Sequence, residues 1–155
     1  MAKPPGNSPF KHAEADASPG FLLWKITALW QRRLAQVLGE FEITQTQYAI
    51  MASLRWFEER REPPTQAHLV EHAKIDKMTL SKAIRKLEDE GLLAREPSPD
   101  DSRAYSIRFT ARGRKLVQQA VRAIEHADDE FFAALGERQL AEYKALTMRL
   151  ISVNA

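Results

Sequence analysis

The spacing of apolar residues changes at Gly91 of this 155-residue chain and returns to a helical spacing after Thr110, and this pattern limits the folds that the chain can adopt. Before Gly91, apolar residues recur every three or four positions, as they do on one face of a helix. After it, Tyr105, Ile107 and Phe109 alternate with other residues, which predicts a strand with one apolar face. A shorter apolar segment at 92–95 is predicted to pair with that strand as a hairpin.

Helices are predicted on both sides of the hairpin. Their expected ranges are 21–39, 45–62, 66–73, 77–90, 111–135 and 137–152. The predicted N-terminal caps are Thr44, Thr65, Asp76 and Thr110, and Thr44 with Gln47 fits a capping box. The fold class is therefore mainly α with a small β-hairpin (α+β), in the order of a winged helix-turn-helix with additional terminal helices.

Composition excludes several classes of protein and site. The chain has no cysteine, so disulfides, thiolate metal sites and thiol redox sensing are excluded. Its apolar runs are too short to span a bilayer and its N-terminus lacks a secretory signal, so we expect a cytoplasmic protein without a membrane partner or cofactor. Residues 1–20 are expected to form a disordered or draped arm before a single domain at 21–153. Within it, 63–110 is the expected lobe with the helix-turn-helix and the hairpin, and 21–62 with 111–153 are the expected terminal helices and linkers.

The helix predicted at 77–90 has a basic face suited to a DNA groove. Its inward residues Leu80 and Ile84 are expected to share a small core with Leu69 of the preceding helix. Hydroxyls and long cations on the outward face can reach base edges and phosphates. That face carries Lys77, Met78, Thr79, Ser81, Lys82 and Arg85. Between residues 74 and 114, ten Lys or Arg stand against seven Asp or Glu. Taken alone, the pattern is also that of an amphipathic helix with a solvated basic face.

The sequence from Ile75 to Arg95 resembles the recognition-helix region of MarR-family regulators. It is followed by Asp101-Ser102-Arg103, a strand, Thr110 and, three residues later, Gly113, which is similar to the wing signature of that family. The resemblance extends over about 21–152 and implies a sequence-specific regulator of transcription, not an enzyme, expected to be a repressor released by a small-molecule effector. A winged helix that serves only protein contacts is the main alternative.

The resemblance also assigns roles to particular residues. It places the recognition helix in the major groove and Arg103 in the minor groove, where a narrow groove attracts cations. Asp101 is expected to brace the wing by pairing with Arg95, or else simply to cap a turn. Thr65 and Gln66 are expected to meet a phosphate, although Thr65 can equally serve as a cap alone.

The terminal helices carry more apolar surface than a winged helix can cover, which predicts a homodimer. The residues concerned are Phe21, Leu22, Leu23, Phe131, Phe132, Leu135, Leu140, Leu150 and Ile151. A two-fold dimer would read a pseudo-palindromic duplex. The alternative is a helical layer within one monomer.

The resemblance further implies a pocket for a small aromatic or anionic effector. Its candidate lining residues are Trp24, Trp30, Tyr48, Met51 and Trp56, each of which is alternatively a plain core residue.

One segment also matches a metal-binding pattern, because His68 and His72 frame an H-x-x-E-H sequence. It coincides with the first helix of the helix-turn-helix and lacks a convincing third ligand, so we expect no metal and keep the pair as weak candidates.

Overall fold

The computed structural model describes residues 6–60, 64–98 and 104–155. In chain order, the helices and strands are a short 3-10 helix Ala15–Ala17, α1 (Pro19–Gly39), α2 (Gln45–Glu59), α3 (Gln66–Ala73), α4 (Lys77–Asp89), β1 (Leu93–Pro97), β2 (Tyr105–Phe109), α5 (Ala111–Phe132) and α6 (Glu137–Asn154). The predicted order, four helices, a hairpin and two further helices, is confirmed.

Most helices begin at the predicted polar caps. The hydroxyl of Thr44 accepts the Gln47 amide at 3.1 Å while the Gln47 side chain accepts the Thr44 amide at 2.9 Å, which completes the capping box of α2. The side chain of Asp76 accepts the amide of Thr79 at 2.9 Å at the start of α4. The first helix was placed too late, because it begins at Pro19, a residue suited to the first turn, after the cap Ser18.

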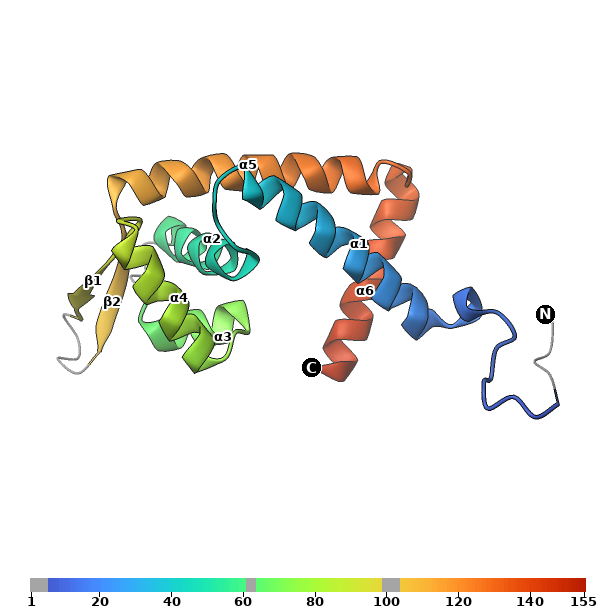
Figure 1. Cartoon of the computed structure of the whole chain (residues 1–155). Coiled ribbons are helices and arrows are strands. Elements are labelled where there is room, and N and C mark those ends of the chain that lie inside the picture. The colour runs from blue at the N-terminus through green and yellow to red at the C-terminus, as the bar shows by residue number, and fades with distance from the viewer. Residues whose placement is uncertain (1–5, 61–63, 99–103) are drawn as a thin grey trace.

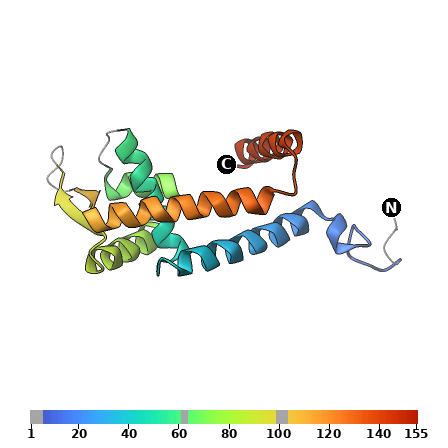
Figure 2. The same cartoon turned by 90° about the horizontal axis from the view of Figure 1, so that it is seen from above.

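The elements are arranged along α5, the long helix that crosses the molecule (Figure 1). At its N-terminal end lie the hairpin and the helices α2, α3 and α4, while α1 runs beside it. At its C-terminal end the chain turns back into α6, which stands apart from the rest when seen from above (Figure 2). The helix-turn-helix and the terminal helices therefore occupy opposite ends of the molecule.

The hydrophobic core lies where α2, α3, α4 and the hairpin meet the first half of α5. Leu69, Leu80 and Ile84 are fully buried in it, as predicted for the two helices of the helix-turn-helix. Helix α2 contributes Ile50 and Leu54 to the same core. This shared core fixes the orientation of α4, so that its remaining face points to solvent.

The hairpin pairs β1 and β2 antiparallel, with Leu93 opposite Phe109 and Pro97 opposite Tyr105. The prediction of one apolar face on this strand was wrong at Tyr105, whose side chain is 55% exposed. Tyr105 lies at the tip end of the strand, beyond the core that covers Ile107 and Phe109. The opposite face is covered at Ser106, which is buried because the segment at Pro64 and Thr65 pairs with β2, its Pro64 carbonyl accepting the Ile107 amide at 3.1 Å.

Candidate nucleic-acid interface

The turn between α3 and α4 is short, and its conformation is fixed by the residues at its two ends. Lys74 ends α3 in the left-handed conformation, with φ 54°, and its side chain forms an ion pair with Glu71. Two residues later the Asp76 side chain caps α4, and its hydrogen bonds from Thr79 lower the pKa of this carboxyl below its ordinary value. The turn therefore sets the angle at which α4 leaves α3.

The outward face of α4 is the exposed basic face predicted from the sequence. Lys77, Met78, Thr79, Lys82 and Arg85 are exposed and Ser81 is half-buried. Among the residues that the structure describes, the three cations of this set form no ion pair, whereas Lys86 lies 3.9 Å from Glu90. Unpaired cations and a long thioether on one helix face are available to contact phosphates and base edges.

A hollow of about 390 Å³ lies between the start of α4, the start of α3 and the start of β2. Thr65, Gln66, Lys77 and Tyr105 are among the residues that line it. Thr65 both caps α3 and borders this hollow, so its two predicted roles are compatible. Tyr105 was missed as an interface candidate because its position in an alternating strand assigned it to the core.

The tip of the hairpin, which includes the predicted wing residues Asp101 and Arg103, lies outside the described residues. Arg95 is described, and its Nε lies 2.8 Å from a carboxylate oxygen of Glu88 on α4. Its guanidinium carbon also lies 5.8 Å from the centre of the Tyr105 ring. The observed contacts of Arg95 therefore brace β1 against α4, and its pairing with Asp101 stays a prediction.

The five aromatic and apolar residues predicted to line an effector pocket are not brought together within the described chain. Met51 is fully buried in the core and Trp24 is 69% exposed on α1. Trp30 packs edge-on against Phe131, with ring centres 5.2 Å apart. Tyr48 is partly buried, and this burial, followed by the charge of Glu125, raises the pKa of its hydroxyl above the ordinary value.

Trp56, the fifth of these residues, lies instead with the two histidines of the H-x-x-E-H segment. It lines an open hollow of about 600 Å³ with Phe57, His68 and His72, among others. The Nδ1 of His68 accepts the Thr65 amide at 3.3 Å, so this ring takes part in the cap of α3. The Nδ1 of His72 lies 2.9 Å from the Ser53 hydroxyl. Within the described ranges, no group of three or more His, Cys, Asp or Glu side chains is placed to hold a metal.

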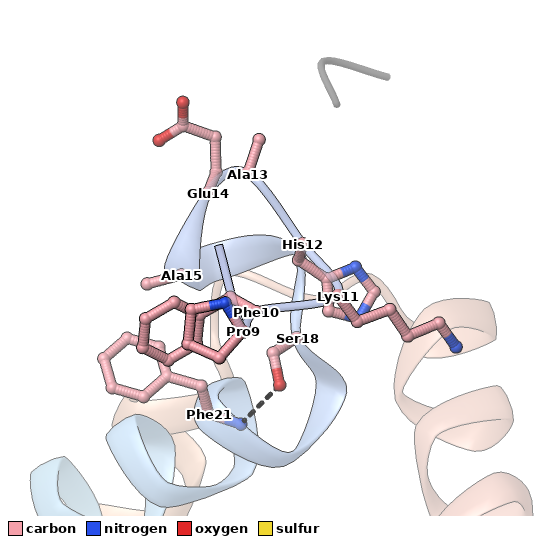
Figure 3. A pocket seen from close by; sticks show the side chains of 9 residues that line it. All are labelled: Pro9, Phe10, Lys11, His12, Ala13, Glu14, Ala15, Ser18 and Phe21. Atoms are coloured by element: carbon pink, nitrogen blue, oxygen red, sulfur yellow. Dashed lines mark hydrogen bonds between the residues drawn. The ribbon is translucent and has the colours of Figure 1, made fainter. Parts of the chain in front are cut away.

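A further hollow of about 690 Å³ lies in the N-terminal segment. Pro9, Phe10, Lys11, His12 and Phe21 are among the residues that line it (Figure 3). The Ser18 hydroxyl accepts the Phe21 amide at 3.4 Å and thereby joins this segment to the start of α1.

Among the helices of the described residues, none combines the length and the apolar composition that a membrane-spanning helix requires.

Comparison with known proteins points to one family. Residues 43–105 match the sequence profile of the MarR family. An HTH-type transcriptional regulator of Bacillus subtilis, YdcH, is 33% identical over 83% of this chain and 88% of its own length. The HTH-type transcriptional repressor Rv2887 of Mycobacterium tuberculosis is 28% identical over 87% of this chain and 94% of its own.

Solved structures show the same fold. The DNA complex of MepR from Staphylococcus aureus has a TM-score of 0.80 at 23% identity and covers 88% of this chain and 98% of that one. BpsR of Bordetella bronchiseptica, in a structure that concerns regulation of its DNA binding by 6-hydroxynicotinic acid, has a TM-score of 0.73 at 23% identity, covering 84% and 96%.

Proposed function

The chain belongs to the MarR family of DNA-binding transcriptional regulators, and from that membership we propose that it is a cytoplasmic homodimeric repressor whose release from DNA is controlled by a small molecule. The observation that carries the proposal is the exposed basic face of α4, held outward by a helix-turn-helix core. Lys77, Lys82 and Arg85 supply its positive charge. Met78 and Thr79 add an apolar thioether and a hydroxyl that can contact base edges.

We place α4 in the major groove and the hairpin tip, with Arg103, in the adjacent minor groove. Thr65 and Gln66 at the start of α3 would meet a backbone phosphate, because that end of the helix carries amide donors and a partial positive charge. The acids Glu88, Asp89 and Glu90 come at the opposite end of α4, away from the residues that read the bases. The distribution of charge along α4 therefore favours an approach in which the end of the helix without these acids faces the DNA.

We assign the homodimer interface to the terminal helices. No residue of α6 is buried within the chain, and its exposed apolar residues include Leu146, Leu150 and Ile151. On α1, Leu22 and Leu23 are also exposed. Large exposed apolar patches usually mark protein interfaces, and a second copy of the same helices would cover these. The division into dimerisation segments 21–62 and 111–153 and a lobe at 63–110 remains part of this proposal.

A two-fold dimer presents two copies of α4 to one face of a duplex. The operator would then be a pseudo-palindrome with half-sites about 10 base pairs apart, centre to centre. An effector that shifts the two lobes relative to each other would release such a dimer, because both helices must fit their grooves together.

We propose a small aromatic or anionic effector. BpsR is a neighbour in fold whose DNA binding is connected with 6-hydroxynicotinic acid, a molecule of that kind. Of the predicted lining residues, Trp30 and Tyr48 are the two that are partly buried near α5. Trp30 packs against Phe131 of that helix, and burial, together with the charge of Glu125 on the same helix, raises the pKa of Tyr48. They are the first positions to substitute once a ligand is found.

A competition gel shift tests the proposal. The labelled probe is the DNA upstream of the protein's own gene, challenged with excess duplex of the same composition but shuffled sequence. Retention of the complex against shuffled competitor supports sequence-specific binding. Equal competition by unlabelled upstream DNA and by the shuffled duplex would contradict it.

A further inference from the structure

A second hollow borders α4 on the side away from Tyr105, between α4 and the start of α2. It measures about 270 Å³ and is lined by Thr44, Thr46, Gln47, Thr79, Lys82, Ala83 and Lys86. We propose that this hollow receives a phosphate group of the DNA backbone, so that the DNA interface extends beyond the helix-turn-helix to α2. The inference rests on the proposed function and adds to it a surface and two residues, Thr46 and Lys86, that the sequence pattern did not identify.

The positions of the two hollows around α4 support this assignment. At 3.6 residues per turn, Lys77 and Lys86 project about 180° apart. Lys77 lines the hollow beside Tyr105, and Lys86 lines the hollow beside α2. Met78, Lys82 and Arg85 project between these two directions. A base-reading helix is therefore flanked by one hollow on each side.

This arrangement matches the shape of the major groove. The groove is about 12 Å wide and a helix with its side chains is about 10–12 Å across, so a helix that enters it has a sugar-phosphate backbone close on either side. The hollow with Thr65 and Gln66 would face one strand. The hollow with Thr46 and Lys86 would face the other.

The chemistry of the second hollow also fits an anion. Lys82 and Lys86 supply two ammonium groups, and the Lys86 side chain is 65% exposed. The Thr44 hydroxyl accepts the Gln47 amide at 3.1 Å and still has its own hydrogen to donate. Gln47 is itself buried and engaged with the backbone of Thr44, so it shapes the hollow and is not free to bind a ligand.

Glu90 is the acidic residue that lies near Lys86 and Gln47 of this hollow. It lies 3.9 Å from the Lys86 ammonium, and its other carboxylate oxygen lies 3.5 Å from the Gln47 amide nitrogen. The long separation from Lys86 makes this a weak pair in solvent. A phosphate, which carries its charge on oxygens that accept from both lysines, can therefore draw Lys86 away from Glu90.

The test is the salt dependence of binding to a random-sequence duplex of about 30 base pairs, measured by fluorescence anisotropy from about 50 to about 200 mM KCl. A backbone contact needs no operator, so this probe separates the inference from sequence recognition. Lys86→Ala is expected to lower the magnitude of the slope of log K against log salt by about two, one for each copy of Lys86 in the homodimer, and to weaken binding to random and upstream duplexes equally. Lys86→Arg should restore the slope.

Two further variants control for charge and folding. Lys11→Ala removes the same charge from the exposed segment before α1, outside the segments assigned to DNA binding and dimerisation, and should leave the slope unchanged. Thr46→Val removes a hydroxyl at nearly constant size and should weaken binding several-fold at constant slope, because no counterion is released by a neutral donor. Thermal unfolding of each variant verifies that it is folded.

The outcomes are distinguishable. An unchanged slope in Lys86→Ala, or an equal loss in Lys11→Ala, overturns the phosphate assignment while leaving DNA binding intact. A loss confined to the upstream duplex would show a base contact and also overturn it. Wild-type protein that binds random and upstream DNA equally, with the slope change present, would defeat the proposed function alone. Absence of any duplex binding would contradict both the phosphate assignment and the proposed function.

Discussion

Gly113 lies so close to the backbone of Leu92 that a Cβ atom added at residue 113 would stand 1.9 Å from the Leu92 carbonyl oxygen. That oxygen cannot easily move away, because it accepts the backbone amide of Thr110 at 3.1 Å. The single hydrogen of the Thr110 hydroxyl is shared between the Gly91 carbonyl at 2.7 Å and the Leu92 carbonyl at 3.2 Å. The same hydroxyl also accepts the Gly113 amide at 3.0 Å. The start of α5 is thereby joined to the base of the hairpin, and through it to the end of α4.

Gly113→Ala is expected to lower the free energy of unfolding by about 2 kcal/mol or more, because overpacking against backbone costs about 1–3 kcal/mol even where side chains can adjust. Urea unfolding followed by circular dichroism measures the change. Gly39→Ala is the matched control, since nothing lies within 4 Å of its added Cβ and the residue ends a helix. Equal stabilities for the two variants would show that the close approach to Leu92 does not constrain the fold.

Asp76 makes stability depend on pH. Its folded pKa is lowered by the hydrogen bonds from Thr79, so the contribution is present above the ordinary value of 3.8 and is lost as pH falls through the folded value. Asp76→Asn keeps a capping side chain without the charge. Its free energy of unfolding should therefore fall less than that of the wild type between about pH 5 and about pH 2. Asp129→Asn on α5 removes a carboxylate that caps no helix, and should follow the wild-type curve.

His68 caps α3 with a ring nitrogen where Gln47 caps α2 with an amide oxygen. Replacement by Gln or by Met compares two unbranched side chains of similar helix propensity, only one of which can accept the Thr65 amide. The Gln variant should be more stable than the Met variant by about 0.5–1 kcal/mol, as judged from typical capping energies. Thermal and urea unfolding give the difference. A Met variant as stable as the Gln variant would remove His68 from the cap.

Most local features of this fold could be predicted because short-range chemistry decides them. Thr44, Thr65, Asp76 and Thr110 each cap the helix expected, since a cap requires only a polar side chain and amides two or three residues away. The inward face of α4 was equally clear from the spacing of its apolar residues.

Features that depend on distant parts of the chain were not predictable in the same way. Tyr105 was assigned to the core because strand alternation does not say where the core ends. Ser106 is buried by a segment around Pro64 that lies some forty residues earlier in the sequence. The ion pair of Arg95 with Glu88 on α4 was not predicted, because these two residues come from different elements, and the pairing of Arg95 with Asp101 stays a prediction. The residues expected around an effector also differ in their surroundings, from the fully buried Met51 to the exposed Trp24.

Arg103→Ala is expected to weaken binding to the upstream DNA at least about tenfold, equivalent to about 1.4 kcal/mol, because a minor-groove cation would be lost. Stability should be almost unchanged, since the hairpin base is held by Thr110 and Arg95. Arg122→Ala removes one exposed positive charge from α5 and serves as the control. Anisotropy titrations compare the three proteins, and equal affinity for wild type and Arg103→Ala would remove the tip of the hairpin from the interface.

The central claim is that two copies of α4 enter successive major grooves on one face of a duplex. Protection of guanine N7, an atom of the major groove, from methylation by dimethyl sulfate measures this directly for the wild-type protein on its upstream DNA. The predicted result is two protected major-groove segments about 10 base pairs apart within a pseudo-palindrome, weakened together by Lys82→Ala. Protection of a single segment, of scattered positions, or of none would contradict it.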